Sequence, residues 1–175
     1  PKKGGHFKVA THIQGPDDTM DPIGTGTATD YSRGRATYNS LIQLRDDLVP
    51  QPELAEEFSA NSDATEWSFK LRKDVTFHDG SKLTADDVVY SMNRHYGDDS
   101  TSVVKSLVSG VTEWKKVGPY EVKAIVDSPY SDLAAVLGEK QFKIVKDGTT
   151  DFSLPTGTGP FKLESFQPGV RSSHV

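Results

Sequence analysis

The chain has 175 residues, of which 25 are acidic and 20 basic, giving a net charge of −5 at pH 7. Nucleic-acid-binding proteins usually carry a basic surface, so this balance argues against that class. Cysteine is absent, which excludes disulfides, thiolate metal sites and a cysteine nucleophile. No apolar run approaches the ~20 residues of a membrane-spanning helix.

The first 46 residues predict a strand, a loop and a helix. Phe7 and Val9 alternate with Lys8 and Ala10, a pattern typical of a short strand. Residues 12–30 are rich in Gly, Pro, Thr and Asp, which predicts a loop. A helix is expected to begin near Thr29 or Asp30. Its inward-facing residues are expected to be Tyr31, Tyr38, Leu41 and Ile42.

The segment that follows predicts connecting chain and then a short helix. Pro50 and Pro52 discourage regular structure on either side, so residues 46–52 are expected to be a connector. Residues 53–58 are a candidate short helix, and residues 61–63 a turn.

The centre of the chain predicts a strand, a turn and an amphipathic helix. Residues 67–71 alternate apolar and polar side chains, as in a half-buried strand, and Val75 and Phe77 continue the signal. Residues 78–81 predict a turn in which Gly80 can adopt a positive φ. Thr84 is a candidate N-cap. One helical face then gathers Ala85, Val88, Val89, Met92 and Tyr96.

The remaining chain predicts a hairpin between short elements. Residues 105–107 favour a short helix, and residues 111–117 and 120–126 favour two strands joined at Gly118-Pro119. Residues 133–137 predict a short helix ended by a glycine, and residues 142–145 a strand. Trp67 and Trp114 are expected in the core.

Four short motifs follow one another in the centre of the chain. They read P-x-P-E-L-A-E from Pro50, W-x-F-x-L-R from Trp67, V-x-F-H-D-G from Val75 and T-A-D-D-V-V-x-S-x-N-R from Thr84. Their order and spacing resemble the signature region of extracellular solute-binding proteins of family 5, the oligopeptide, dipeptide and nickel type. Residues 157–161, G-T-G-P-F, resemble the point where that family's chain crosses back to its first domain.

The resemblance implies an α/β (α+β) fold of the type II periplasmic-binding-protein kind. In that fold a mixed-sheet domain carries an inserted smaller α+β domain. Residues 1–46 would begin the first, discontinuous lobe domain, residues 47–156 would be the inserted domain, and residues 157–175 the crossover and return strand. Family members are several hundred residues longer, so we expect an N-terminal fragment whose second lobe is missing.

The resemblance also implies the substrate-binding component of an ABC importer, a receptor and not an enzyme, with no cofactor. Its partners would be a small-molecule or peptide ligand and the transporter permease, with no nucleic acid and no membrane contact except through the permease. Peptides are the leading ligand class; opines, nickel complexes and sugar-like solutes are the alternatives. The expected location is periplasmic, or extracellular and membrane-associated in a Gram-positive source.

Ligand contacts are expected from loops at strand ends and from the crossover. By position the resemblance points to Thr11, His12, Ile13, Thr27, Ala28, Thr29, Gly157, Thr158 and Gly159. Six of them have a simpler interpretation: His12 as a solvated loop residue, Thr27 to Thr29 as helix caps, and both glycines as backbone-geometry residues. Because the family's selectivity residues lie largely in the second lobe, we expect weak or no solute binding by this chain alone.

Two other functions stay open on the sequence. One is a hydrolase that uses His78 and Asp79, although a turn at a strand end explains both residues. The other is an autonomous interaction domain, residues 47–156, that docks a partner along a strand edge. The five histidines show no paired metal-ligand spacing; they are His6, His12, His78, His95 and His174.

Overall fold

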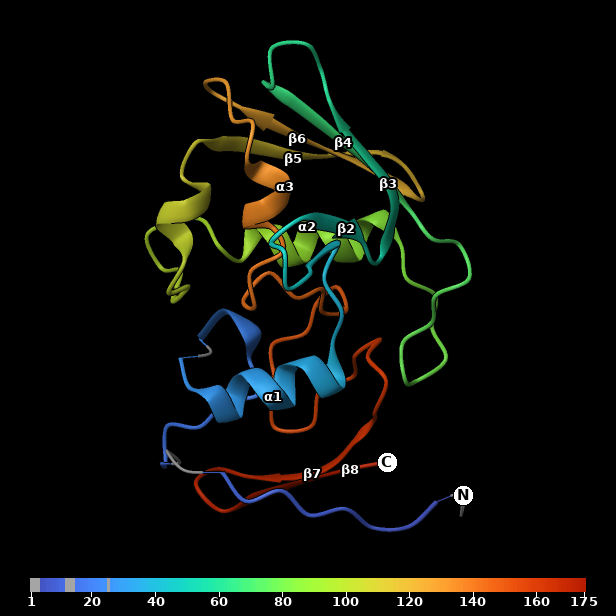
Figure 1. Cartoon of the computed structure of the whole chain (residues 1–175), viewed down its shortest axis with the longest axis vertical. Coiled ribbons are helices and arrows are strands. Elements are labelled where there is room, and N and C mark those ends of the chain that lie inside the picture. The colour runs from blue at the N-terminus through green and yellow to red at the C-terminus, as the bar shows by residue number, and fades with distance from the viewer. Residues whose placement is uncertain (1–3, 12–14, 25) are drawn as a thin grey trace.

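The computed structural model describes residues 4–11, 15–24 and 26–175. Figure 1 shows a larger part built on a four-stranded sheet, above a smaller part that holds helix α1 (Ala28–Thr37) and a two-stranded sheet. That small sheet pairs β7 (Leu163–Gln167) with β8 (Arg171–His174). The chain enters the larger part after α1 and returns before β7, so the predicted mixed α/β fold is confirmed.

The four-stranded sheet is antiparallel, in the order β3-β4-β6-β5. Its strands are β3 (Ala55–Ala60), β4 (Glu66–Leu71), β5 (Val111–Gly118) and β6 (Glu121–Val126). The predicted strand at 67–71 and the predicted hairpin around Gly118-Pro119 are both confirmed. Trp67 and Trp114 are buried in the core, as predicted.

The short helix predicted at residues 53–58 is wrong, because most of this segment is β3. Ala55 to Ala60 pair with β4, and Phe58 stacks on Phe69 with ring centroids 6.5 Å apart. Cross-strand pairing of this kind outweighs the weak helical preference of a run containing Ala and Glu. The connector predicted around Pro52 is also partly wrong, since β2 (Pro50–Pro52) pairs with β1 (Ile42–Leu44).

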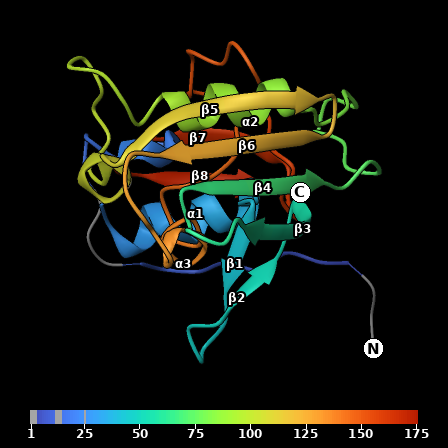
Figure 2. The same cartoon turned by 90° about the horizontal axis from the view of Figure 1, so that it is seen from above.

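Helix α2 (Ala85–Asn93) covers one face of the sheet. Figures 1 and 2 show it lying beneath β5 and β6, on the side that faces the smaller part. Its predicted apolar face is confirmed, with Ala85, Val88 and Met92 buried. The largest fully buried side chains of this core are Phe69, Phe77, Phe142, Leu41, Ile42, Leu71, Leu83, Met92, Leu133, Leu137 and Ile144.

Asp87 fixes the start of α2. One carboxylate oxygen accepts from the Thr84 N–H at 2.7 Å and from Thr84 Oγ1 at 3.0 Å, and the other accepts from the Asp147 N–H at 2.9 Å. We expect Asp87→Ala to lower the free energy of unfolding by about 1–2 kcal/mol, because it removes the cap and leaves buried donors unpaired. Urea denaturation followed by circular dichroism measures this.

The neighbouring acid supplies the matched control. Asp86 is exposed and only pairs with Lys116 across the surface. Asp86→Ala should therefore change stability by less than about 1 kcal/mol. Equal losses from the two variants would contradict a capping role for Asp87.

The strand predicted at residues 142–145 is wrong, although the segment is extended and buried. It makes one bridge, between Lys143 and Ser40, instead of a ladder. A side chain takes the place of a neighbouring strand: Ser91 Oγ accepts from the Val145 N–H at 2.9 Å and lies 3.0 Å from the Val145 carbonyl oxygen. The strand signal at Val75 and Phe77 likewise yields only the bridge between Thr76 and Lys82.

Short helices complete the larger part where they were predicted. The turn η2 (Lys105–Val108) and helix α3 (Leu133–Val136) follow the predicted positions. Gly138 follows α3 and has an ordinary φ. Glycine is favoured here because the Leu44 side chain lies close to it: a Cβ at this position would be 2.5 Å from Leu44 Cγ.

The smaller part has its own apolar cluster, made by Met20, Tyr38, Val145 and Leu163. It also contains the 3-10 turn η1 (Pro22–Gly24) and α1, which begins one residue before the predicted start. The strand predicted at Phe7 and Val9 is wrong. Residues 4–11 form no strand, and Phe7 is 91% exposed, because no neighbouring strand pairs with this segment.

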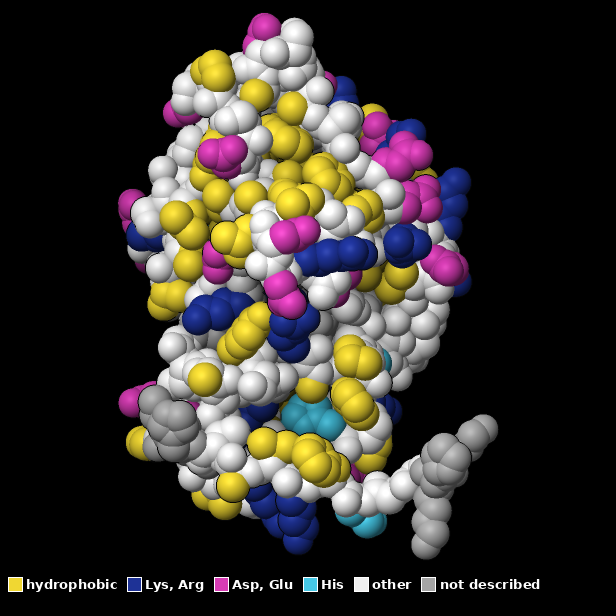
Figure 3. Space-filling model, in the orientation of Figure 1, with side chains coloured by type: hydrophobic (Ala, Val, Ile, Leu, Met, Phe, Trp, Pro, Cys, Tyr) yellow, Lys and Arg dark blue, Asp and Glu magenta, His cyan; other side chains and the backbone are white. Residues whose placement is uncertain are grey.

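Apolar side chains also reach the surface of the smaller part, as Figure 3 shows below the larger part. The exposed ones are Phe7, Val9, Phe161, Val170 and Val175. Exposed apolar groups that gather in this way are typical of a surface that another segment or partner covers. Among the described residues no helix is both long enough and apolar enough to cross a bilayer.

Candidate functional site

Of the predicted contact residues at the start of α1, Thr27 caps the helix. Thr27 Oγ1 accepts from the Asp30 N–H at 3.1 Å and donates to Asp30 Oδ2 at 2.9 Å. Thr29 is buried and Ala28 is exposed. Thr11 is exposed, whereas His12 and Ile13 lie outside the described residues.

The predicted crossover, residues 157–159, presses against the last turn of α1. The Gly159 N–H donates to the Thr37 carbonyl oxygen at 2.9 Å. A Cβ added at Gly157 would lie 1.9 Å from Thr37 O, and one added at Gly159 would lie 2.5 Å from Thr37 C. Only glycine lets the two backbones approach this closely, which is the backbone-geometry role expected for both residues.

His78 holds the crossover from the other side. Its Nδ1 accepts from the Gly157 N–H at 3.3 Å, so the proton belongs on Nε2, which lies 2.8 Å from Gly159 O. The His78 N–H donates to Gly157 O at 2.8 Å. Asp79 bonds to Ser81 and Lys146 instead, and the Lys146 ammonium is the main reason that the pKa of Asp79 is lowered. The pair thus holds the loops in place and does not form a nucleophile–base arrangement.

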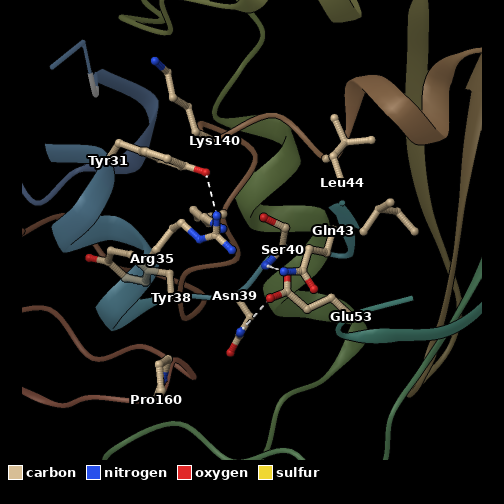
Figure 4. Close-up of a pocket in the computed structure, with 13 residues that line it drawn as sticks. Tyr31, Arg35, Tyr38, Asn39, Ser40, Gln43, Leu44, Glu53, Lys140 and Pro160 are labelled. Carbon is tan, nitrogen blue, oxygen red and sulfur yellow. Dashed lines mark hydrogen bonds between the residues drawn. The ribbon is translucent and has the colours of Figure 1, made fainter. Parts of the chain in front are cut away.

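A pocket of about 250 Å³ opens between α1, the segment 38–44 and the loop 138–143. Figure 4 shows side chains from these segments converging on it. Its lining is mostly polar and comprises Tyr31, Arg35, Tyr38, Asn39, Ser40, Ile42, Gln43, Leu44, Glu53, Gly138, Lys140, Lys143 and Pro160.

Two cations share one aromatic ring at the mouth of the pocket. Arg35 donates to the Tyr31 hydroxyl at 2.9 Å, and its guanidinium lies 5.6 Å from the Tyr31 ring centroid (Figure 4). The Lys140 ammonium lies 5.8 Å from the same centroid. Such cation–π contacts hold both side chains beside the opening without neutralising their charge.

The third cation, Lys143, lies deeper and is only 9% exposed. Burial lowers the pKa of its ammonium, the negative charge of Glu53 opposes that shift, and the nearby Arg35 charge adds to it. A buried cation close to a second cation is the kind of perturbed group that marks functional sites.

The only carboxylate of the lining, Glu53, is held by neutral donors. Asn39 Nδ2 donates to Glu53 Oε1 at 2.8 Å, and the Ser40 N–H donates to Oε2 at 2.7 Å (Figure 4). Thr158 Oγ1 donates to Asn39 Oδ1 at 3.0 Å, which fixes the orientation of the Asn39 amide. Thr158, one of the predicted contact residues, thus supports the pocket indirectly, through Asn39.

None of the predicted contact residues that the structure describes lines the pocket. Residues 27–29 and 157–159 nevertheless lie at the two ends of α1, which contributes to the lining. Sequence reasoning missed Arg35, Lys140 and Lys143. The spacing of Lys140 and Lys143 is the only local signal, and two lysines three apart are ordinary on a surface. Across the described residues, no group of three His, Asp or Glu side chains has the geometry of a metal site.

The comparisons with known proteins agree on one family. Residues 49–174 match the profile described as "Bacterial extracellular solute-binding proteins, family 5 Middle". The glutathione-binding protein GsiB of Salmonella choleraesuis is 25% identical over 154 residues, which is 85% of this chain and 30% of GsiB. The uncharacterized protein YhjP of Bacillus subtilis is 31% identical over 153 residues.

Solved structures share the fold. The mannopinic-acid complex of MoaA from A. tumefaciens R10 overlays with a TM-score of 0.81 at 26% identity, covering 90% of this chain and 34% of MoaA. A nickel ABC transporter structure from Bacillus halodurans overlays with a TM-score of 0.77 at 30% identity, covering 90% of this chain and 32% of that one.

The chain thus spans about 30% of the length of relatives such as GsiB. The family profile nevertheless covers well over half of the chain itself. The protein therefore belongs to the bacterial extracellular solute-binding proteins of family 5.

Proposed function

We propose that the chain supplies part of the first lobe of a receptor that captures a solute and delivers it to an ABC importer permease, at the periplasmic or extracellular face of the membrane. The observation that carries this proposal is the family profile over residues 49–174. Peptides are the leading solute class, since relatives include a glutathione-binding protein and a dipeptide-binding protein crystallised with Met-Leu.

We propose the same division of the chain as the resemblance implies: residues 1–46 and 157–175 in the first domain, and residues 47–156 as an inserted domain. The two apolar clusters support two folding units. The clusters also exchange residues near the boundaries, since Leu41 and Ile42 of the first range pack into the larger cluster and Val145 of the inserted range packs into the smaller one. The crossover clamped by His78 is the return connection.

Solute capture would then work by closure of two lobes. The ligand stabilises the closed state only through contacts that it gains on closing. In this proposal α1, the pocket beside it and the crossover present one wall of the cleft. The exposed apolar side chains of the smaller part would pack against further chain of the longer protein.

The test compares two proteins by calorimetric titration. The longer protein that carries this chain should bind at least one member of a panel of short peptides, glutathione, opines and nickel chelates with a Kd of about 10 μM or tighter. The 175-residue chain alone should bind none of them at that level, because the contacts of the second lobe are missing.

Either of two results would overturn the proposal. If the longer protein binds no solute of the panel, the receptor function is wrong. If the 175-residue chain alone binds a solute with the affinity of the longer protein, capture between two lobes is wrong.

A further inference from the structure

The pocket beside α1 contains three cations, Arg35, Lys140 and Lys143, and a single carboxylate, Glu53. None of the three cations forms a salt bridge with any carboxylate in the described ranges. Both Glu53 oxygens are already occupied by the neutral donors of Asn39 and Ser40. The lining therefore carries positive charge that the protein itself does not pair.

One buried polar group of the lining, the Ser40 hydroxyl, also lacks a hydrogen-bond partner among the described residues. Lys143 beside it is 9% exposed, and its ammonium forms no salt bridge within the described ranges. Buried polar groups are almost always satisfied, so the unpaired Ser40 hydroxyl, beside an ammonium without a salt bridge, points to a ligand that accepts hydrogen bonds.

We propose that this pocket receives an oxyanion of the solute, a carboxylate or a phosphate group, held by Arg35, Lys140 and Lys143 with Ser40 Oγ as an additional donor. The proposal rests on the proposed receptor function and specifies the chemistry of the solute. It makes the three cations specificity-determining residues, because an oxyanion would pair charges that a neutral solute leaves unpaired.

The arrangement suits such a ligand in three ways. Arg35 offers a planar set of donors, which matches the two oxygens of a carboxylate. The guanidinium of Arg35 and the ammonium of Lys140 lie 5.6 and 5.8 Å from the Tyr31 ring centroid, so contacts with this ring position both charges before the ligand arrives. Glu53 lies near enough to favour the charged form of Lys143, while its own oxygens stay engaged with Asn39 and Ser40.

Two-dimensional proton–nitrogen NMR correlation spectra of the 175-residue chain test the proposal with three probes: succinate, inorganic phosphate and the neutral succinamide. We expect succinate, phosphate or both to shift the amide signals of Ser40, Gln43 and Lys143 with a Kd of about 1 mM or tighter. Comparison of the two anions tells which oxyanion the site takes. Succinamide should cause no such shifts.

Variants locate the binding. Lys143→Met should weaken anion binding by about 10-fold or more, the loss expected for a buried charged contact. Lys73→Met removes the same charge from an exposed position outside the pocket and should leave the affinity unchanged. Arg35→Gln, at an exposed residue, replaces Lys143→Met if that variant loses its dispersed spectrum.

The proposal is wrong if neither anion shifts these signals, if succinamide binds as well as succinate, or if Lys143→Met and Lys73→Met weaken binding equally. These outcomes leave the receptor function untouched, since the pocket is tested with small anions on this chain and the receptor with solutes on the longer protein. Conversely, anion binding by this chain together with no solute binding by the longer protein would support the anion site and contradict the receptor function.

Discussion

Gly157→Ala should lower the free energy of unfolding by about 3 kcal/mol, the upper range for overpacking a tight contact. The new methyl group would lie 1.9 Å from Thr37 O, 2.8 Å from Thr37 C and 2.9 Å from the Tyr38 ring. The two nearest obstacles are backbone atoms, which cannot rotate away as a side chain can. The crossover would have to shift and so lose its hydrogen bonds to His78.

Gly34→Ala is the matched control, because it makes the same chemical change on the helix against which Gly157 packs. Gly34 lies inside α1, and nothing beyond its own helix comes within 4 Å of a Cβ placed there. Alanine should therefore stabilise the protein by about 0.5–1 kcal/mol through helix propensity. Urea denaturation of both variants measures the contrast, and a Gly157→Ala protein as stable as the parent would show that the crossover is not clamped on α1.

The elements predicted from the sequence are those that local chemistry decides. Alternation at 67–71, the turn before Thr84 and the Gly118-Pro119 hairpin each carry their own signal within a few residues. Phe7 and Val9 show the same alternation as β4, but no neighbouring strand pairs with them. Pairing between distant segments decides whether alternation becomes a strand, and a single sequence does not contain that information.

The candidate site was less predictable for the same reason. Its lining comes from four separate segments between Tyr31 and Pro160, and each contributes common surface residues. The glycines of the crossover were visible as a motif, and the structure gives them a packing role. The three cations form no motif and become recognisable only when folding places them around one cavity, whose single carboxylate, Glu53, is held by neutral donors.

Acid should weaken the fold through His95, which follows α2 and is 1% exposed. Its Nδ1 lies 2.7 Å from Ser102 Oγ, its ring packs 4.6 Å from the Phe142 ring, and Nε2 has no partner among the described residues. Burial, with a smaller effect of the Arg94 charge, lowers the pKa of His95 to about 4. A protonated ring here would be a buried cation with no counter-charge.

The direction of the effect follows from proton uptake. Between the ordinary pKa of 6.5 and the folded-state pKa of about 4, the unfolded chain binds a proton at His95 that the folded chain does not. Stability should therefore fall as pH decreases through this window, by up to about 3 kcal/mol, and this group adds no further loss below it. The pKa of Asp18 is lowered from 3.8 by its hydrogen bond with Arg33, so the stability that this carboxylate contributes is lost only at lower pH.

His95→Gln separates this group from the rest, because glutamine keeps a polar contact for Ser102 but does not titrate. The readout is the difference in urea-unfolding free energy between pH about 7 and pH about 4.5, so a constant loss of stability in the variant does not affect it. Most of the acid-induced loss should disappear in His95→Gln. His174→Gln should remove a smaller share, since the pKa of His174 is lowered in the same direction by partial burial. An acid-induced loss of unchanged size in His95→Gln would mean that His95 takes up its proton inside the fold, and that Ser102 and Phe142 do not enclose it as closely as the structure indicates.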